Sequence, residues 1–368
     1  MKRIAYVGVD YHVNSVSVAV LIEGASDFLD CIHIRNDDKT IRKYLQKLSK
    51  EYELRVCYEA CNSGYVFQRK VRGWGCHCDV IAPSLIPRKP GDRRKNDFRD
   101  ARNLTQNYRA GTLTIVHPPS EEEESIRAII RCRFALKEAA KRTKQQINNF
   151  VLGQDHHWPK SKWGSQHRSW LIQIRTLLDP HLQMVLDEHL GHLDYLETRI
   201  KRLEWEIEQL ARSDMYAPSV NKLCAFRGIA SLSAMLLIAE ITDFRRFGSP
   251  GALMAFLGLI PSEDSSGDKQ SGGPVTKAGN PRCRAQIIES VQHYVKRPVI
   301  GPKMKENLAK VDAQSANIAI KCMNRLHKRF WALTMKGKIR NVAITAIARE
   351  FIGFIWAMMQ NEPETARG

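Results

Sequence analysis

The sequence lacks several features that would assign it to a particular class of protein. No uninterrupted apolar run approaches the roughly 20 residues that a membrane-spanning helix needs, and no internal repeat or low-complexity tract stands out. The first residues, MKRIAYVGVDYH, pass directly into a strand-like alternation, without the long apolar segment and cleavage site of a secretory signal. We therefore expect a soluble, cytoplasmic globular protein that makes no use of a membrane.

Cysteines in a zinc-binding spacing are also missing. The chain has nine cysteines, an odd number, and the group Cys76-His77-Cys78 with Cys57 and Cys61 upstream matches none of the usual paired-cysteine patterns. Without a secretory signal, reduced thiols are the expectation. Neither a disulfide framework nor a zinc site is predicted.

Acidic residues are few relative to basic ones. Lys and Arg number 57 against 39 Asp and Glu among 368 residues, a formal net charge of +18. The excess is spread over the whole chain with no basic amphipathic tail, which favours an extended polyanion such as nucleic acid. The most basic stretch is IPRKPGDRRKNDFRDAR. The predicted nucleic-acid-binding residues are Arg88, Lys89, Arg93, Arg94, Lys95, Arg99, Arg102, Lys277 and Arg282.

The first hundred residues alternate between strand and helix signals. β-rich runs lie at 4–10, 15–21 and 31–35, and further expected strands lie at 54–58 and 78–81. Helical spacing of apolar residues is found at 39–52, 65–72 and 96–109. The order βββαβαβα predicts a mixed sheet flanked by helices.

Two long helices follow. Ser120 and Glu123 form a capping box that opens a helix to Gly153. After a loop rich in His, Trp and Lys (DHHWPKSKWGSQHRSW), a helix over 180–212 has leucines and isoleucines spaced by threes and fours. That spacing indicates a coiled-coil seam, or a helix pair formed with the first long helix, or both in a helical hairpin that dimerises.

The remainder is expected to be mostly helical. LCAFRGIASLSAMLLIAEI predicts a helix, a tight turn and a second helix, which is either a phosphate-binding hairpin or simply a packed one. Ala230 stands where a phosphate-binding turn usually has its second glycine. SEDSSGDKQSGGPVTKAGNPR is predicted to be a Gly/Ser-rich loop, and helices continue to about Met359.

Four acidic residues coincide with the expected ends of these elements. Asp10 ends the first strand and Glu59 the fourth, while Asp97 and Asp100, three residues apart, share one face of a helix. Carboxylates this close repel unless a cation neutralises them, and hard divalent cations prefer carboxylate oxygen. We predict a Mg²⁺ or Mn²⁺ site inside a nucleic-acid groove, where two ions clamp the oxygens of a phosphodiester.

These residues carry a resemblance. The sequence resembles the DEDD transposases of bacterial insertion sequences, related to the Piv-type DNA invertases and known as bridge-RNA-guided serine recombinases. Nearly the whole chain is covered: GVDYH, CYEACNSGY and KNDFRDAR contain the acids, and FRGIASLSAMLLIAEI, FGSPGALMAFLGLIPSEDSSG, TKAGNPRCR and NVAITAIAREFIGFIWAM follow. The resemblance implies three parts: an RuvC/RNase H-like domain over 1–118, a helical coiled-coil region over 119–213 and a helical transposase domain over 214–368.

The same resemblance implies the chemistry and the partners. Asp10, Glu59, Asp97 and Asp100 fall on the metal-binding tetrad of the family, with Mg²⁺ as the expected ion and Mn²⁺ as its substitute. Ser266 fits the family's serine nucleophile, with Ser265 as the alternative. Expected partners are donor and target DNA, a non-coding bridge RNA and further copies of the chain, as a homodimer or tetramer, on the nucleoid of a prokaryotic cell.

Two other functions remain open from the sequence. One is a metal-dependent nuclease of the Holliday-junction-resolvase type, which would use the same four acids with water as nucleophile and would not need Ser266. The other is a non-catalytic nucleic-acid-binding protein, against which the presence of all four acids argues.

Overall fold

The chain folds into two compact units, Met1–Pro119 and Ser120–Gly368. The computed structural model describes residues 2–61, 63–87, 97–266 and 269–360, and each unit is described by itself. The three-part division expected from the sequence stays a prediction.

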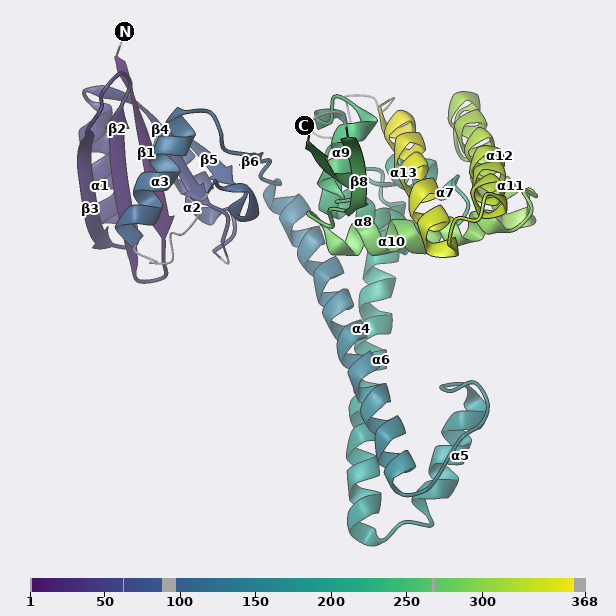
Figure 1. Ribbon diagram of the computed structural model, residues 1–368. Coiled ribbons are helices and arrows are strands. Elements are labelled where there is room, and N and C mark those ends of the chain that lie inside the picture. The colour runs from purple at the N-terminus through teal and green to yellow at the C-terminus, as the bar shows by residue number, and fades with distance from the viewer. Residues whose placement is uncertain (1, 62, 88–96, 267–268, 361–368) are drawn as a thin grey trace. The chain divides into compact units, whose positions relative to one another are not determined.

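The first unit is built on one mixed sheet, as the sequence predicts (Figure 1). Its strand order is β3-β2-β1-β4-β5-β6, with β1, β2 and β3 antiparallel and with β4 and β5 parallel to β1. β3 begins three residues earlier than expected, and β6 was not expected. The strands are β1 (Arg3–Tyr11), β2 (Ser15–Ile22), β3 (Phe28–Arg35), β4 (Tyr52–Glu59), β5 (His77–Ile81) and β6 (Ile115–Val116).

Helices cover both faces of this sheet. α1 (Asp38–Ser49) and α2 (Val66–Gly73) bury their apolar side chains against one face, among Val7, Val9 and Tyr58. α3 (Asp97–Arg109) packs on the other face through Ala101, Leu104 and Thr105. Because side chains alternate along a strand, Gly8 faces α3 while its neighbours Val7 and Val9 face α1 and α2.

The second unit contains a long helical stem (Figure 1). The stem consists of α4 (Glu121–Gly153), which begins at the predicted capping box, and α6 (Pro180–Arg212). Leu186, Leu193 and Leu196 of α6 are buried in one apolar cluster with residues of α4. The regularly spaced leucines of α6 therefore pack against α4 of the same chain. The predicted loop between the two helices is partly wrong, since α5 (Ser165–Arg175) occupies its second half.

The rest of the unit is a helical core. α8 is buried on all sides, which explains why its sequence is apolar at nearly every position. The helices are α7 (Ala217–Cys224), α8 (Ser231–Ile241), α9 (Pro250–Phe256), α10 (Pro281–Val291), α11 (Pro302–Leu308), α12 (Ala313–Met335) and α13 (Arg340–Met359). This unit also has 3-10 turns at Phe244–Arg246 and Gln292–Val295, and the first unit has one at Pro83–Leu85.

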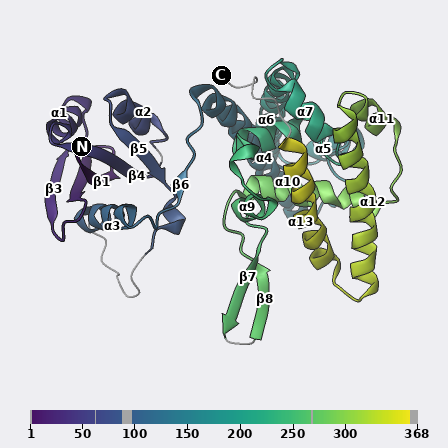
Figure 2. The same ribbon diagram turned by 90° about the horizontal axis from the view of Figure 1, so that it is seen from above.

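The predicted Gly/Ser-rich loop over residues 262–282 is partly wrong, because two paired strands lie in it, and only residues 276–280 connect β8 to α10 without a helix or strand. β7 (Pro261–Ser266) pairs antiparallel with β8 (Lys269–Val275), and Figure 2 shows the hairpin extending beyond the helices of its unit. The glycines that suggested a loop have a structural use. A Cβ on Gly273 would lie 2.2 Å from Oγ of Ser262, so a larger residue would displace that hydroxyl from its hydrogen bond to the carbonyl of Pro274.

α13 is, among the described residues, the one helix long and apolar enough to cross a membrane. Half of its most apolar window is nevertheless buried inside the protein. Phe351 packs edge-to-face on Phe226 and against Tyr294, with ring centroids 5.3 and 5.4 Å apart. These contacts place one face of α13 in the second unit's core.

Candidate active site

The site begins where β1 and β4 end side by side. The two strands are parallel, with Val9 opposite Tyr58, so Asp10 and Glu59 follow at the same edge of the sheet. The carboxyl ends of neighbouring parallel strands are a common place for polar groups to converge. Both acids are partly exposed, as a group that binds an external ligand must be.

α3 reaches this edge because it packs unusually close to β1. The backbone N–H of Gly8 donates to the hydroxyl of Thr105 at 3.0 Å, and that buried hydroxyl lies 2.7 Å from the carbonyl oxygen of Ala101. A Cβ on Gly8 would lie 2.3 Å from the Thr105 oxygen. Glycine at this position therefore sets the distance between α3 and β1, and with it the position in space of the first turn of α3.

The close approach brings Asp97, at the start of α3, next to the end of β1. Nε2 of His12 lies 3.2 Å from Oδ2 of Asp10 and 3.8 Å from Oδ1 of Asp97. One ligand atom from each of the three residues lies within 4.8 Å of the other two. The sequence patterns do not single out His12, because a single histidine after a strand carries no distinguishing pattern.

Burial and charged neighbours together shift the pKa of Asp10. Burial raises the pKa of Asp10, the adjacent His12 opposes that change, and the negative charges of Asp97 and Asp100 raise the pKa further. A divalent cation would relieve the repulsion, and the donors present, carboxylate oxygens with one imidazole, are ones that Mg²⁺ and Mn²⁺ accept. The residues thus fit a metal ion.

The predicted nucleic-acid-binding residues are distributed over both units. Arg99 and Arg102 of α3 are exposed, and the guanidinium of Arg102 lies over the ring of Phe28, 4.8 Å from its centroid. Lys277 is exposed and Arg282 partly buried in the second unit. Arg88, Lys89, Arg93, Arg94 and Lys95 lie outside the described residues.

Comparisons with known proteins give the family of this chain. A family model described as the transposase family IS116/IS110/IS902 matches residues 220–306, and a model of DEDD transposases of the IS110 type matches residues 7–154. A protein of Sinorhizobium fredii named as a transposase, y4qE, is 34% identical over 99% of this chain and 90% of its own. The chain belongs to the IS110/IS116 transposase family.

Other transposases align with this chain at lower sequence identity. The transposase for insertion sequence element IS1533 of Leptospira borgpetersenii is 30% identical over 92% of this chain and 99% of its own length. The transposase for IS1328 of Yersinia enterocolitica is 24% identical over 77% of this chain. The match over residues 7–154 contains the acidic group, and the match over residues 220–306 contains the β7–β8 hairpin.

The backbone of this transposase places Ser266 at the end of β7. It is paired with Lys269, and its neighbour Ser265 with Gln270. The chain continues from the hairpin into residues 276–280, which pack against the end of α9. Two glycines with positive φ make this contact, Gly258 just after α9 (φ +66°) and Gly279 in the segment itself (φ +112°). A Cβ on Gly279 would lie 2.1 Å from the carbonyl oxygen of Phe256, so the base of the hairpin is fixed by close backbone contact.

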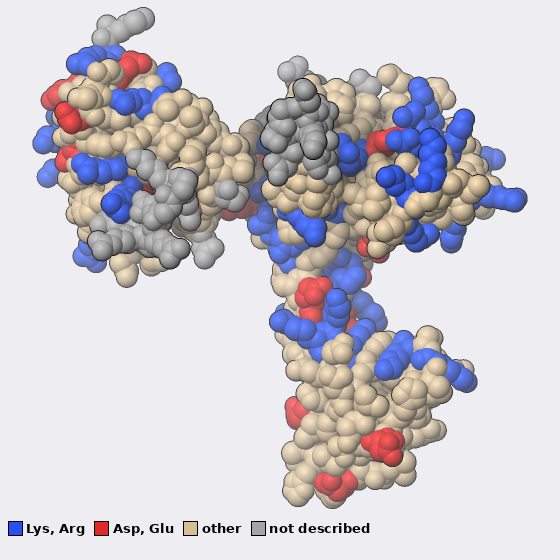
Figure 3. Space-filling model, in the orientation of Figure 1, with Lys and Arg blue, Asp and Glu red and all other residues tan. Residues whose placement is uncertain are grey.

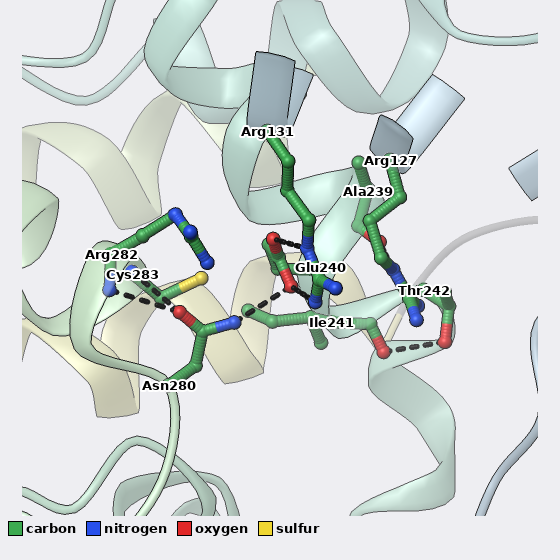
Figure 4. A network of polar contacts seen from close by, with 9 residues as sticks. All are labelled: Arg127, Arg131, Ala239, Glu240, Ile241, Thr242, Asn280, Arg282 and Cys283. Atoms are coloured by element: carbon green, nitrogen blue, oxygen red, sulfur yellow. Dashed lines mark hydrogen bonds and ion pairs between the residues drawn. The ribbon is translucent and has the colours of Figure 1, made fainter. Parts of the chain in front are cut away.

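A buried ion-pair network anchors the same segment (Figure 4). Glu240 of α8 is buried, and both of its oxygens accept hydrogen bonds from Arg131 of α4, at 2.8 and 2.7 Å. Nδ2 of Asn280 donates to the same carboxylate at 2.7 Å, while its Oδ1 caps α10. Burial alone would raise the pKa of Glu240, but the bonds and charges of Arg131 and Arg127 hold it below its ordinary value. Glu240 thus joins the stem to the chain that leaves the hairpin.

The contact between Gly8 and Thr105 predicts a measurable effect on this transposase. Gly8→Ala should lower the free energy of unfolding by about 1–3 kcal/mol, because the new methyl group overpacks a filled interface. It should also slow strand cleavage, since α3 carries Asp97 and Asp100. Thermal melting and a single-turnover cleavage assay measure the two effects. Gly73→Ala, where a Cβ meets nothing within 4 Å, is the matched control. Wild-type behaviour of Gly8→Ala would show that α3 is not positioned by this contact.

Proposed function

We propose that this chain is the DNA transposase and recombinase of an insertion sequence, acting through a metal site made by Asp10, Glu59, Asp97 and Asp100 in a domain of the RuvC/RNase H type. The observation that supports it most is the approach of Asp97 to Asp10, which β1 and α3 produce in a chain of this transposase family. Sheet order and the parallel β1–β4 pair are compatible with that domain type.

The tetrad residues would hold Mg²⁺, or Mn²⁺ in its place. When bound, the ion supplies positive charge to the phosphate oxygens as negative charge develops on them. Two of the proposed ligands, Asp10 and Glu59, belong to the sheet, whereas the other two, Asp97 and Asp100, belong to α3. His12, hydrogen-bonded to Asp10, keeps that carboxylate oriented toward Asp97.

Ser266 is proposed as the nucleophile. Its hydroxyl oxygen forms a bond to phosphorus, its proton is withdrawn, and the bond from phosphorus to one deoxyribose oxygen breaks, leaving a free hydroxyl on that strand end. One phosphodiester is exchanged for another, so the DNA can be rejoined by the reverse reaction without an external energy source. The position of Ser266 at the end of a β-hairpin is compatible with access to a DNA backbone.

The proposed partners are donor DNA, target DNA, a bridge RNA that pairs with both, and a homodimer or tetramer of the chain. The leucines of α6 are already buried against α4, so self-association would use other surfaces than the predicted seam. The net charge of +18 supports binding of polyanions of either kind.

A reconstituted reaction tests this function. The purified protein is mixed with DNA carrying the insertion-sequence ends, a target DNA and the non-coding RNA transcribed beside the gene. We expect recombinant junctions only when the RNA is present, and a changed RNA loop should redirect the reaction to a target with the compensating change. Cutting that needs no RNA and yields no joined product would instead establish the resolvase-like nuclease.

A further inference from the structure

A cavity of about 330 Å³ lies near the end of the stem that is remote from the helical core (Figure 1). It is enclosed by the last turns of α4, the segment before α5 and the first turns of α5. None of the proposed chemistry uses it. Its lining is polar and aromatic: Gln145, Asn148, Asn149, His156, His157, Trp158, Lys162, His167 and Trp170 contribute, with apolar contacts from Val151 and Leu152.

Three tryptophans surround the buried His167, and two of them, Trp158 and Trp170, line this cavity with it, while Trp163 lines the neighbouring one. The ring of His167 stacks on Trp170 with centroids 5.5 Å apart, and lies 5.0 Å from Trp163 and 5.7 Å from Trp158. All three tryptophans remain partly exposed. A cluster of aromatic rings with exposed edges could serve either packing or the stacking of a planar ligand.

The two ring nitrogens of His167 favour ligand binding over a role in packing alone. Its Nδ1 accepts from the backbone N–H of Trp163 at 3.2 Å, so in the neutral ring the proton is on Nε2. Burial, with Lys162 and Arg168 nearby, lowers the pKa of His167, which keeps the ring neutral. Nε2 is buried and has no hydrogen-bond partner in the protein. His167 therefore brings an unused donor into a wall of the cavity.

Asn148 contributes the complementary group. Its Oδ1 is likewise buried without a hydrogen-bond partner, and Asn148 lines the same cavity. Buried polar groups are nearly always paired, because leaving them unpaired destabilises the fold. A donor and an acceptor left unpaired in one aromatic cavity match the edge of a nucleobase, which presents both kinds of group beside a flat apolar face.

Basic side chains lie next to this cavity. A second cavity of about 550 Å³ shares Gln145 and Asn148 with the first. It is lined by four lysines, Lys137, Lys141, Lys144 and Lys201, and by Glu197 and Glu204, of which Glu197 pairs with Lys144 at 2.8 Å, so the lysines exceed the acids. Figure 3 shows Lys and Arg side chains gathered along the stem and over the segment before α5. Nζ of Lys144 also lies over Trp163, 5.3 Å from the ring centroid. Positive charge beside an aromatic wall is the arrangement that holds a nucleic-acid backbone while a base stacks.

We propose that the cavity around His167 binds an unpaired nucleobase of a single-stranded nucleic acid. The base stacks on the exposed surface of the Trp158–Trp170 pair, His167 Nε2–H donates to it, and Asn148 Oδ1 accepts from it. The adjoining phosphates lie along the lysines of the second cavity. RNA and DNA share this chemistry, and the experiment distinguishes them. The site is independent of the acidic tetrad.

The experiment uses the full-length protein and a short single-stranded RNA with one central 2-aminopurine. A DNA of the same sequence and an RNA that is abasic at the central position are bound in parallel. We expect stacking on tryptophan to quench the fluorescence of the base, and the abasic oligomer to bind about tenfold or more weakly, because it keeps the phosphates and loses the base. Tighter binding of RNA or of DNA identifies the source of the base.

Asn148→Leu is the decisive variant. It removes the unpaired acceptor while keeping the side-chain shape, so the melting temperature should be unchanged or higher while affinity falls about tenfold. Gln146→Leu, on the same helix but outside both cavities, is its control. Lys162→Ala should weaken binding more than Lys160→Ala, which removes the same charge outside the lining.

Two results would overturn the proposal. If Asn148→Leu raises the melting temperature but leaves affinity unchanged, the unpaired atoms are merely hydrated. If the abasic RNA binds as tightly as the intact one, the lysines alone hold nucleic acid and the cavity takes no base. Should Asn148→Leu fold poorly, equal binding by the two lysine variants would lead to the same rejection.

Discussion

Asp97→Ala should bind DNA nearly as tightly as the unchanged protein and yet cut it at least about a hundredfold more slowly. The carboxylate lies beside His12 and Asp10 and is proposed to hold a metal ion, whereas Lys and Arg side chains are proposed to bind the phosphates of DNA. Removing one acid therefore removes charge stabilisation of the reacting phosphate without removing the groups that hold the duplex. A gel-shift assay and a cleavage assay on the same samples separate the two effects.

The matched control is Asp27→Ala, the same change at an exposed acid of the first unit that takes no part in the acidic group. It should retain full cleavage. Chelation of divalent cations should stop the wild-type reaction, Mg²⁺ and Mn²⁺ should restore it, and Ca²⁺ should support binding without cleavage. Full cleavage by Asp97→Ala would contradict the metal-site proposal, whatever its DNA affinity.

Ser266→Ala should abolish both a covalent protein–DNA adduct and the recombinant product while leaving DNA binding intact. A serine nucleophile joins the protein to one DNA end, and that bond should survive a denaturing gel. The substitution removes the attacking oxygen but no carboxylate and no basic side chain. Loss of adduct and product together is the signature of a nucleophile, because a structural defect in the hairpin would also change binding or stability.

Ser265→Ala is the control next to it in the chain. Both serines lie in β7, paired with Gln270 and Lys269 on β8, so the two variants make the same change in the same strand. If Ser265→Ala is the inactive protein, the nucleophile is Ser265. If both variants cut DNA and no adduct forms, water is the nucleophile and the chain acts as a metal-dependent nuclease.

The secondary structure of the first unit was predictable because each element carries its own local pattern. The runs around Val7, Val18 and Val56 have the composition and alternation of buried strands, and the structure has strands there. Prediction failed where the pattern was misleading. The glycines and serines of residues 262–275 suggested a loop, but they are used in a hairpin whose strands need close approach at Gly273.

The stem shows the limit of a periodic pattern. Leu186, Leu193 and Leu196 predict a buried helical face, and they are buried. The spacing does not encode whether the partner helix belongs to the same chain or to another one, because both partners bury the same apolar area. In the structure the partner helix is α4 of the same chain, which lies alongside α6 because the connection through α5 reverses the chain direction.

The sequence by itself determined most helices and strands of this protein and the positions of Asp10, Glu59, Asp97 and Asp100 at or near the ends of such elements, because strand and helix patterns are local. Tertiary structure decided what lies next to what. Gly8 and Thr105 are 97 residues apart, and their contact depends on the shapes of a strand and a helix that meet only after folding. For the same reason His12 joins Asp10 and Asp97 only in the folded chain, and His167 and Asn148 keep unpaired polar atoms in one cavity that no spacing in the sequence reveals.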